Sequence, residues 1–355
     1  MQVFFDAEGR PFLLDHEMRW PLEANAFLAR ISVVNGKTRS PKTWRSYAYQ
    51  FADWLGFCVR AGVECRMATE LDLATYRNIL AAEPSPHTGR PLVRNTINYK
   101  LSVVAQFYKF ANKKGWIDNL PFELEETRIP AGGCHSTATV ERNSLRLAST
   151  EEEIDIPSRQ DIRRFIASFK RWRDRLIAET MWLTGMRCAE VCWLPLDALP
   201  EDPTALEKDT VAVKIVGKGQ RRRSVLFPAR LLRSLDRWIQ MERPRLVEKA
   251  RQLTNSVFVG GRGKPLQTAA LNAAFSTNCK RTGLKIRPHQ LRHGYAVERL
   301  AYLQDIGAPN PLKTVQMELG HAHMATTERY LHLTERMRNE VIEAHNSFVD
   351  RLLEG

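Results

Sequence analysis

The strongest constraint on the fold is the helical spacing of apolar residues in the first third of the chain. Apolar side chains recur every three or four residues over 40–62 and again from about 93 to 114. This spacing places them on one face of a helix in each segment, with basic side chains on other faces. Shorter helical patterns start at Pro21 and span roughly Thr69–Leu80. The four segments predict a helical bundle whose aromatic residues form a core rather than a surface on which bases stack.

A break in this periodicity divides the chain. The polar run Ser136–Ser149 has no regular apolar pattern, so we expect a flexible linker between domains at residues 131–150. A chain of 355 residues is long enough for two domains, each with its own core. We therefore expect a helical domain at 17–130 and a second domain at 151–355. A small hairpin is expected at residues 1–16.

The balance of charges favours a polyanionic partner. The chain has 53 Lys and Arg against 40 Asp and Glu, which gives a formal net charge of +13. This excess points to a nucleic acid, although a basic soluble protein of another kind would share it. The sequence has no apolar run long enough to span a membrane, no recognisable signal peptide and no Cys-Xaa-Xaa-Cys pair among its six cysteines. We therefore expect an intracellular protein with reduced thiols and no zinc ribbon.

A stretch near the C-terminus surrounds one tyrosine with polar and basic residues. Asn310-Pro311 predicts the start of a helix, and Gly320 predicts a left-handed residue that ends it. Thr326 or Thr327 is expected to cap a second helix and to place Tyr330 in its first turns. Because a phenol with a pKa of about 10 is a poor nucleophile at pH 7, a reactive Tyr330 needs cations around its target. Taken alone, a half-buried structural tyrosine is the commoner outcome.

An arginine and a glutamate follow the end of another expected helix. Gly185 is predicted to end a helix over Leu176–Thr184, which leaves Arg187 at the start of the next one. Glu190 comes three residues later and shares a helix face with Arg187. We expect its carboxylate to orient the guanidinium, and a purely structural ion pair is the alternative.

A lysine lies between two segments with strand-like alternation. Residues 210–216 and 222–227 alternate apolar and polar side chains, as half-buried strands do. They predict a hairpin with Lys218 at a tip flanked by Gly217 and Gly219.

Two histidines and an arginine are expected on one helix face. His289, Arg292 and His293 lie at positions i, i+3 and i+4 after a proline that favours a helix start. A zinc site is disfavoured, because Gln290 occupies the position where metalloproteases have a glutamate base and no third ligand is evident.

Together these motifs resemble the tyrosine recombinases, also called phage-type integrases. The similar segments are Thr184–Glu190, Gly217–Gln220, His289–His293 and the run from Leu319 to His332. They occur in the family's order over about half the chain. The resemblance implies a mainly α fold. An N-terminal SAM-like four-helix core-binding domain would be joined to an α-rich catalytic domain with a small antiparallel β-sheet.

The resemblance also implies roles for individual residues. Tyr330 would attack a DNA phosphate and form a 3′-phosphotyrosine bond, and Lys218 would protonate the departing 5′ oxygen. The side chains expected to complete the catalytic set around the phosphate are Arg187, His289, Arg292 and His321. Glu190 and His293 would support this set from behind. The family needs no metal ion or other cofactor, because these cations take the place of a divalent ion.

Basic residues outside the catalytic set are candidates for contacts with DNA phosphates. In the helical domain these are Arg90, Arg94, Lys100, Lys109, Lys113 and Lys114, and beside the expected hairpin tip they are Arg221 and Arg222. For any one of them, an ordinary solvated helix face is an equally good explanation.

The resulting prediction is a site-specific recombinase of the integrase or transposase type. The alternatives are a type IB topoisomerase-like activity and a catalytically silent DNA-binding protein. Expected partners are double-stranded DNA with inverted-repeat core sites, further copies of the chain in a tetrameric synapse, and accessory recombinases or architectural proteins. An amphipathic helix over Thr334–Leu353 would pack on its own domain or on a neighbouring copy. The expected location is the bacterial cytoplasm, in association with the nucleoid.

Overall fold

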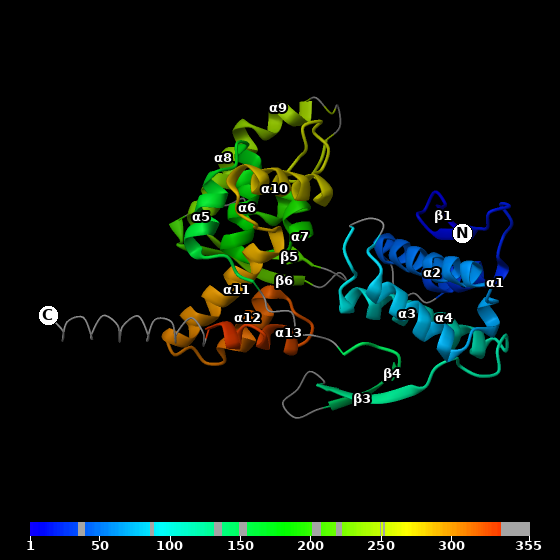
Figure 1. The fold of residues 1–355 in the computed structure, drawn as a ribbon. Helices are drawn as coiled ribbons and strands as arrows, with labels where there is room; N and C mark the ends of the chain where they lie inside the picture. Colours follow the sequence, from blue (N-terminus) through cyan, green and yellow to red (C-terminus); the bar gives the residue numbers. More distant parts are fainter. Residues whose placement is uncertain are drawn as a thin grey trace. The chain divides into compact units, whose positions relative to one another are not determined.

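The computed structural model describes residues 1–34, 40–85, 89–130, 137–148, 155–200, 207–217, 222–248, 250 and 253–334. The chain forms two compact units, Met1–Glu152 and Glu153–Gly355 (Figure 1). Both contain mainly helices with two-stranded antiparallel sheets, which confirms the expected fold class. None of the helices in these described ranges is both long and apolar enough to cross a membrane.

The helices of the first unit begin and end near their expected positions. They are α1 (Leu22–Ala29), α2 (Pro41–Ala61), α3 (Glu70–Ala82) and α4 (Arg94–Lys113), with a π-helical turn η1 (Arg30–Val34) after α1 and a 3₁₀ turn η2 (Cys65–Met67) before α3. Pro41 occupies the first turn of α2, and Gly62 ends this helix with a φ of +67°. Thr69 caps α3 through a reciprocal pair of hydrogen bonds with Asp72.

Aromatic side chains fill the core of the first unit. Phe27 of α1, Phe51 of α2 and Phe107 of α4 lie within 5.6 Å of one another, measured between ring centroids, and each is almost fully buried. Trp54 packs edge-on against Tyr76 of α3. The aromatic stripe is therefore core, as its spacing predicts.

The N-terminal hairpin pairs β1 (Gln2–Phe5) with β2 (Pro11–Leu14) and confirms the expected element. The side-chain amide of Asn25 in α1 exchanges two hydrogen bonds with the backbone of Leu13, at 2.7 and 2.9 Å. The guanidinium of Arg45 lies 4.4 Å above the ring of Phe5. The hairpin is thus part of the packed unit.

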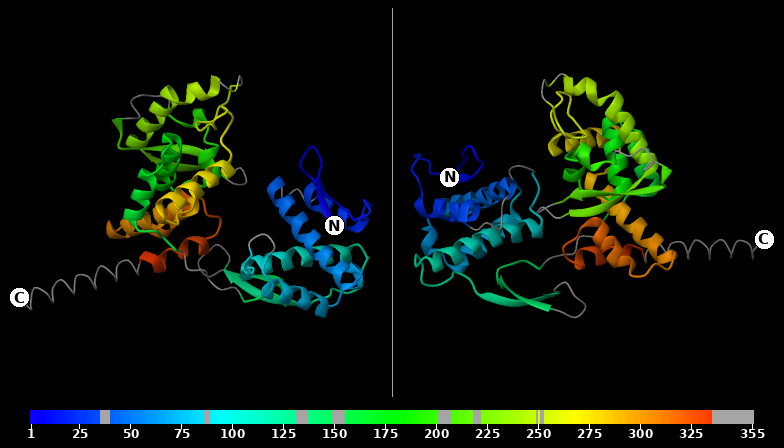
Figure 2. Two further views of the ribbon diagram at one scale, coloured as in Figure 1. Left: turned by 45° about the horizontal axis from the view of Figure 1, so that its top comes forward. Right: turned by 180° about the vertical axis from the view of Figure 1, so that it is seen from behind.

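The expectation of a flexible linker over 131–150 is wrong for residues 137–148, and its remaining residues lie outside the described part of the chain. β4 (Thr137–Asn143) pairs antiparallel with β3 (Leu124–Pro130) to form a second hairpin, which Figure 2 shows from two further sides. After β4, the backbone of Leu147 exchanges two 2.8 Å hydrogen bonds with the buried side chain of Asn98 in α4. The first unit consequently extends past residue 130.

The second unit is built around α6 (Trp172–Thr184). This helix packs against α5 (Arg159–Ala167), α7 (Cys188–Cys192), α8 (Ala229–Met241), α11 (Pro288–Asp305) and strand β6 (Arg222–Pro228). Leu176, Ile177 and Met181 of α6 have no exposed surface. The other elements are η3 (Leu196–Ala198), β5 (Thr210–Val216), α9 (Arg243–Glu248), α10 (Thr268–Thr282), α12 (Pro311–Leu319) and α13 (Ala325–Glu328).

Two short helices precede Tyr330. α12 begins at Pro311 and ends at Gly320, whose φ is +67°, as the sequence predicts. The expected threonine cap of the next helix is wrong: α13 starts at Ala325 after Met324, without a side-chain cap. Thr327 lies inside α13 with no exposed surface, and its hydroxyl contacts His321 instead. Tyr330 follows in the turn after α13.

Candidate active site

Arg187 lies where the sequence places it, between two helices. Gly185 ends α6 with a φ of +65°, and a Cβ atom at this position would lie 2.4 Å from the ring of Tyr295. Arg187 is the residue before α7, and its backbone N–H donates to Glu190 Oε2 at 2.7 Å. Its Nη1 donates to Glu190 Oε1 at 2.9 Å. The expected contact between the two side chains is present.

Three arginines donate to consecutive carbonyl oxygens at the end of α12. Arg223 Nε donates to the carbonyl of Glu318 at 2.9 Å, Arg292 Nη2 to that of Leu319 at 2.7 Å, and Arg187 Nη2 to that of Gly320 at 3.0 Å. The last carbonyls of a helix lack partners within the helix and lie at the negative end of its dipole. The end of α12 therefore gathers three cations that come from β6, α11 and the start of α7.

Arg292 is the most deeply buried of these cations. Its side chain is 1% exposed, and its Nη1 donates to the carbonyl of Gly185 at 2.6 Å. Burial and the neighbouring Arg187 lower the pKa of its guanidinium to about 9, so it stays charged at pH 7. Its Nε has no hydrogen-bond partner among the described residues. A buried charged donor of this kind is rarely left without a partner in a folded protein.

Glu190 binds a second arginine that the sequence analysis did not single out. Arg223 donates to both carboxylate oxygens, at 2.7 and 2.9 Å. Burial alone would raise the pKa of Glu190, but Arg223 and then Arg187 lower it to about 2. The sequence signal for this contact is the alternation of side chains between the two faces of a strand. Arg223 shares a strand face with Val225 and Phe227, both of which are core residues. It therefore points inward, unlike the exposed Arg222.

The histidines lie around the tyrosine. Nδ1 of His293 is 2.8 Å from the hydroxyl of Tyr330, and the rings of His293 and His289 are 4.2 Å apart. The ring of His321 stacks at 6.2 Å from that of Tyr330, while its Nδ1 lies 2.9 Å from the hydroxyl of Thr327. The structure thus brings His289, His293, His321 and Tyr330 together, although they are distributed over 42 residues of sequence.

These histidines are held in their neutral form. Burial, followed by the charges of Arg292 and Arg187, lowers the pKa of His321 to about 3. Burial and the adjacent His289 lower the pKa of His293 to about 4. At pH 7 each imidazole therefore has one nitrogen that donates a hydrogen bond and one that accepts.

Tyr330 is 1% exposed. Burial raises the pKa of its phenol, and Arg292, Arg329 and Arg187 oppose that rise. The cations that a nucleophilic tyrosine needs are therefore close enough to act on it.

Gln290, which argues against a zinc site, has a local role. Its side-chain oxygen accepts from the backbone N–H of Arg287 at 2.8 Å and so caps α11. In the described ranges, no group of three or more His, Cys, Asp and Glu side chains could hold a metal ion.

Several predicted residues lie outside the described part of the chain. Lys218 and Arg221 belong to the segment between β5 and β6, and these strands pair antiparallel from Thr210↔Pro228 to Val216↔Arg222. The hairpin expected around Lys218 is therefore confirmed up to its tip. The helix expected over 334–353 lies beyond the last described residue, Thr334.

The candidates for DNA contacts differ from one another. Arg90, Arg94 and Lys113 are exposed in the first unit, as is Arg222 in the second. Lys100 is not available in the same way: its Nζ lies 2.7 Å from Asp53 Oδ2, and only 12% of its side chain is exposed. The assignment of Lys100 to the DNA-binding set stays a prediction, and a DNA contact would have to compete with this ion pair.

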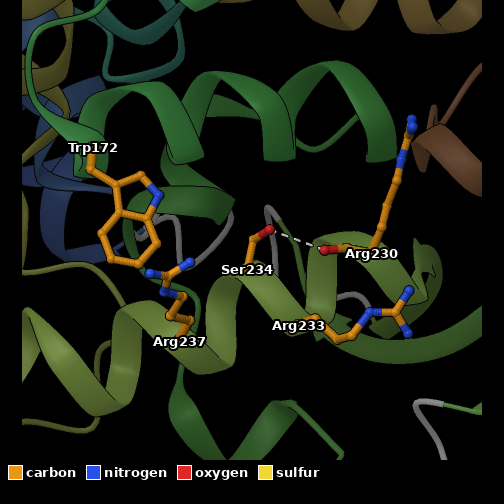
Figure 3. A pocket seen from close by; sticks show the side chains of 5 residues that line it. All are labelled: Trp172, Arg230, Arg233, Ser234 and Arg237. Atoms are coloured by element: carbon orange, nitrogen blue, oxygen red, sulfur yellow. Dashed lines mark hydrogen bonds between the residues drawn. The ribbon is translucent and has the colours of Figure 1, made fainter.

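A separate basic groove lies on α8. It has a volume of about 570 Å³ and is lined by Trp172, Arg230, Arg233, Ser234 and Arg237 (Figure 3). The guanidinium of Arg237 lies 5.8 Å from the centroid of the Trp172 ring. The groove contains none of the predicted catalytic residues, so the candidate site is the cluster at the end of α12.

Comparisons with known proteins find similar sequences. Residues 158–337 match the family model described as the Phage integrase family. Tyrosine recombinase XerC of Bacillus subtilis (strain 168) is 29% identical over 262 residues, which cover 72% of this chain and 76% of that protein. Tyrosine recombinase XerC of Pseudomonas syringae pv. tomato is 28% identical over 305 residues, which cover 83% of this chain and 86% of that protein.

Solved structures share the fold. The XerH site-specific recombinase in a post-cleavage complex with palindromic difH DNA has a TM-score of 0.63 and 18% identity, with 90% of this chain and 87% of that one covered. The Tn1549 transposon integrase in complex with circular intermediate DNA has a TM-score of 0.60 and 15% identity, and the match covers 90% of this chain and 99% of that one.

Proposed function

Because the chain belongs to the phage integrase family, we propose that it is a site-specific tyrosine recombinase that cuts and rejoins DNA strands through a 3′-phosphotyrosine intermediate, without a metal ion or ATP. The observation that carries this proposal is the contact between Tyr330 and His293 beside the arginines at the end of α12. The relatives do not favour the alternatives, a type IB topoisomerase-like activity or a silent DNA-binding protein.

Two guanidinium groups bind the scissile phosphate in this proposal. Arg187 and Arg292 donate hydrogen bonds to its non-bridging oxygens, for which the planar fork of arginine is well shaped. His289 and His321 donate from the neutral imidazole. Negative charge grows on these oxygens as the phosphate becomes pentacoordinate, so fixed donors stabilise the transition state more than the ground state. Removal of one such donor typically slows a reaction by about 10²- to 10³-fold.

The strand-cleavage step exchanges one phosphoester bond for another. The Tyr330 oxygen forms a bond to phosphorus as the bond from phosphorus to the 5′ oxygen breaks. The phenolic proton passes to Nδ1 of His293, which already lies at hydrogen-bond distance. Lys218 gives a proton to the departing 5′ oxygen. The phosphotyrosine bond retains the energy of the broken bond, so a second strand is joined by the reverse step without ATP.

The proposed substrate is double-stranded DNA with inverted-repeat core sites. The net charge of +13 and the exposed Arg90, Arg94, Lys113 and Arg222 support a contact with phosphates. Arg221 would add to it. Similar structures include recombinases bound to DNA, such as a lambda integrase dimer on a COC′ core site. We extend the proposal to a tetrameric synapse, to accessory recombinases or architectural proteins, and to the bacterial cytoplasm and nucleoid.

The experiment that tests this function traps the covalent intermediate. The probe is a set of duplexes that tile the DNA on either side of the gene, each with a nick beside a candidate scissile phosphate. Cleavage then releases a short 5′ fragment, which diffuses away and leaves the protein on the 3′ end. The expected result is an adduct that survives a denaturing gel and also forms in excess EDTA. No adduct on any duplex, or a strict need for magnesium, would overturn the proposal.

Two phenylalanine variants identify the nucleophile. Tyr330→Phe removes only the hydroxyl, so DNA affinity should stay near wild-type while the adduct disappears. Tyr302→Phe is the matched control, because Tyr302 lies on α11 of the same unit and is 55% exposed. It should form the adduct at the wild-type rate. An adduct in the Tyr330→Phe protein would show that a residue other than Tyr330 is the nucleophile.

A further inference from the structure

Arg223 is a buried arginine whose three nitrogen atoms are all occupied by the protein. Nη1 and Nη2 bind Glu190, Nε binds the carbonyl of Glu318, and the side chain is 9% exposed. A Cβ atom at Gly320 would lie only 2.8 Å from Arg223 Cδ, so the arginine passes directly beside the end of α12. Such a side chain spends three of its five N–H donors on the protein and has little exposed surface with which to reach DNA.

Glu190 is shared between Arg223 and Arg187. Its Oε1 accepts from Arg223 Nη1 at 2.7 Å and from Arg187 Nη1 at 2.9 Å, while Oε2 accepts from Arg223 Nη2 and the backbone of Arg187. A carboxylate that is 5% exposed needs its counter-charges. Without Arg223, Arg187 would be the only guanidinium left to neutralise Glu190. The carboxylate would then draw Arg187 away from Gly320 and the phosphate site.

The position of Arg223 on β6 adds a second link. β6 is the strand that leads away from the segment with Lys218, and Arg223 pairs with Ile215 across the hairpin. Through one side chain, the part of this hairpin next to its tip is therefore fastened both to Glu190 of α7 and to the last turn of α12.

We propose that Arg223 is a positioning residue for strand cleavage, which holds Glu190 so that Arg187 faces the scissile phosphate and which anchors the hairpin of the catalytic lysine. This inference rests on the proposed recombinase function. It assigns Arg223 no contact with the substrate.

The test is a double-mutant cycle of cleavage rates. Adduct formation is measured on the nicked duplex that the wild-type protein cleaves, at saturating protein, for the wild type, Arg223→Ala, Glu190→Gln and the double variant. Arg223→Ala should cleave about 10- to 100-fold more slowly, the range typical of residues that orient catalytic groups, with unchanged DNA affinity. Because Arg223 acts through Glu190, the double variant should be little slower than the slower single variant.

Controls separate positioning from folding. Lys214→Ala removes an exposed cation from the partner strand β5 and should leave the cleavage rate unchanged. If Arg223→Ala does not fold, Arg223→Lys keeps the positive charge but cannot form the two-pronged contact with Glu190, and it should also cleave slowly.

Two results would overturn this inference alone. One is a wild-type cleavage rate in the folded Arg223 variant. The other is a double variant whose loss of rate equals the product of the losses in the two single variants. A wild-type protein that forms no adduct would instead overturn the proposed function, and this inference with it.

Discussion

Glu190 is a carboxylate buried between two guanidinium groups, and its titration links the site to stability. Folding lowers its pKa from 4.5 to about 2. The stabilisation is therefore complete above about pH 4.5 and is lost as the pH falls toward 2. The difference between these pKa values corresponds to roughly 3 kcal/mol.

The first prediction concerns Glu190→Gln. This variant should be less stable than the wild type at pH 7, because it lacks the ion pairs with Arg223 and Arg187. The gap should narrow as the pH falls from about 4.5 to 2, where the wild type loses the same interaction. The measurement is urea unfolding of both proteins at several pH values. A gap that stays constant over this range would contradict the ion-pair interpretation.

The second prediction concerns His293. If it accepts the proton of Tyr330, His293→Ala should slow adduct formation by about 10²-fold, the lower end of the range for general base catalysis. DNA affinity should not change. His323→Ala is the control, because His323 is exposed in the loop before α13. Equal rates for His293→Ala and the wild type would mean that the 2.8 Å contact only holds the tyrosine in place.

At the scale of elements, the end of α12 combines a left-handed residue with three arginine contacts. Two separate reasons favour glycine at position 320. Its φ is +67°, and a Cβ atom there would collide with Arg223. Gly307 has a similar φ of +64° but open space around it. A comparison of alanine substitutions at the two positions therefore separates the effect of backbone strain from the effect of the collision.

The third prediction compares alanine at these two glycines. Gly307→Ala should lower the free energy of unfolding by about 1–2 kcal/mol, the cost of a left-handed non-glycine residue. Gly320→Ala should lower it further and should also slow cleavage, because Arg223 must move. Thermal unfolding and the nicked-duplex assay measure the two effects. If Gly320→Ala cleaved at the rate of Gly307→Ala, the position of Arg223 would not matter for the reaction.

Helices were predictable where their ends contain specific residues. Pro41 and Gly62 bound α2, and Gly185 ends α6 at the expected position. The side chain of Ser158 accepts from the N–H of Asp161 and caps α5, a capping preference that serine shows at the start of many helices. Each of these residues has a backbone or capping preference that acts locally, so it is legible without the rest of the fold.

Elements that depend on distant partners were not predictable. β4 has no alternating apolar pattern, and its pairing with β3 is the evidence for a strand. Thr327 looks like a helix cap, but its hydroxyl is used by His321, six residues away. Arg223 looks like one member of a solvated basic run until Glu190 is found opposite it. In each case a tertiary contact overrides a local preference.

At the scale of the whole molecule, the excess of positive charge should govern affinity for DNA. The fourth prediction is a steep dependence of binding on salt. Each neutralised phosphate should lower log K by about 0.9 for every tenfold rise in salt concentration. Fluorescence anisotropy with a labelled duplex between low and moderate salt measures the slope. A nearly flat slope would count against binding through phosphates.

The contacts at the end of α12 have a consequence for how this sequence tolerates change. The acceptors for Arg223, Arg292 and Arg187 are main-chain oxygens, which every amino acid supplies. Substitutions within α12 would leave these acceptors in place wherever the helix still forms. An insertion or deletion of one residue would instead rotate the helix end by about 100° and shift it by about 1.5 Å. All three arginines would lose their partners together, so the length of α12 should be under stronger selection than most of its side chains.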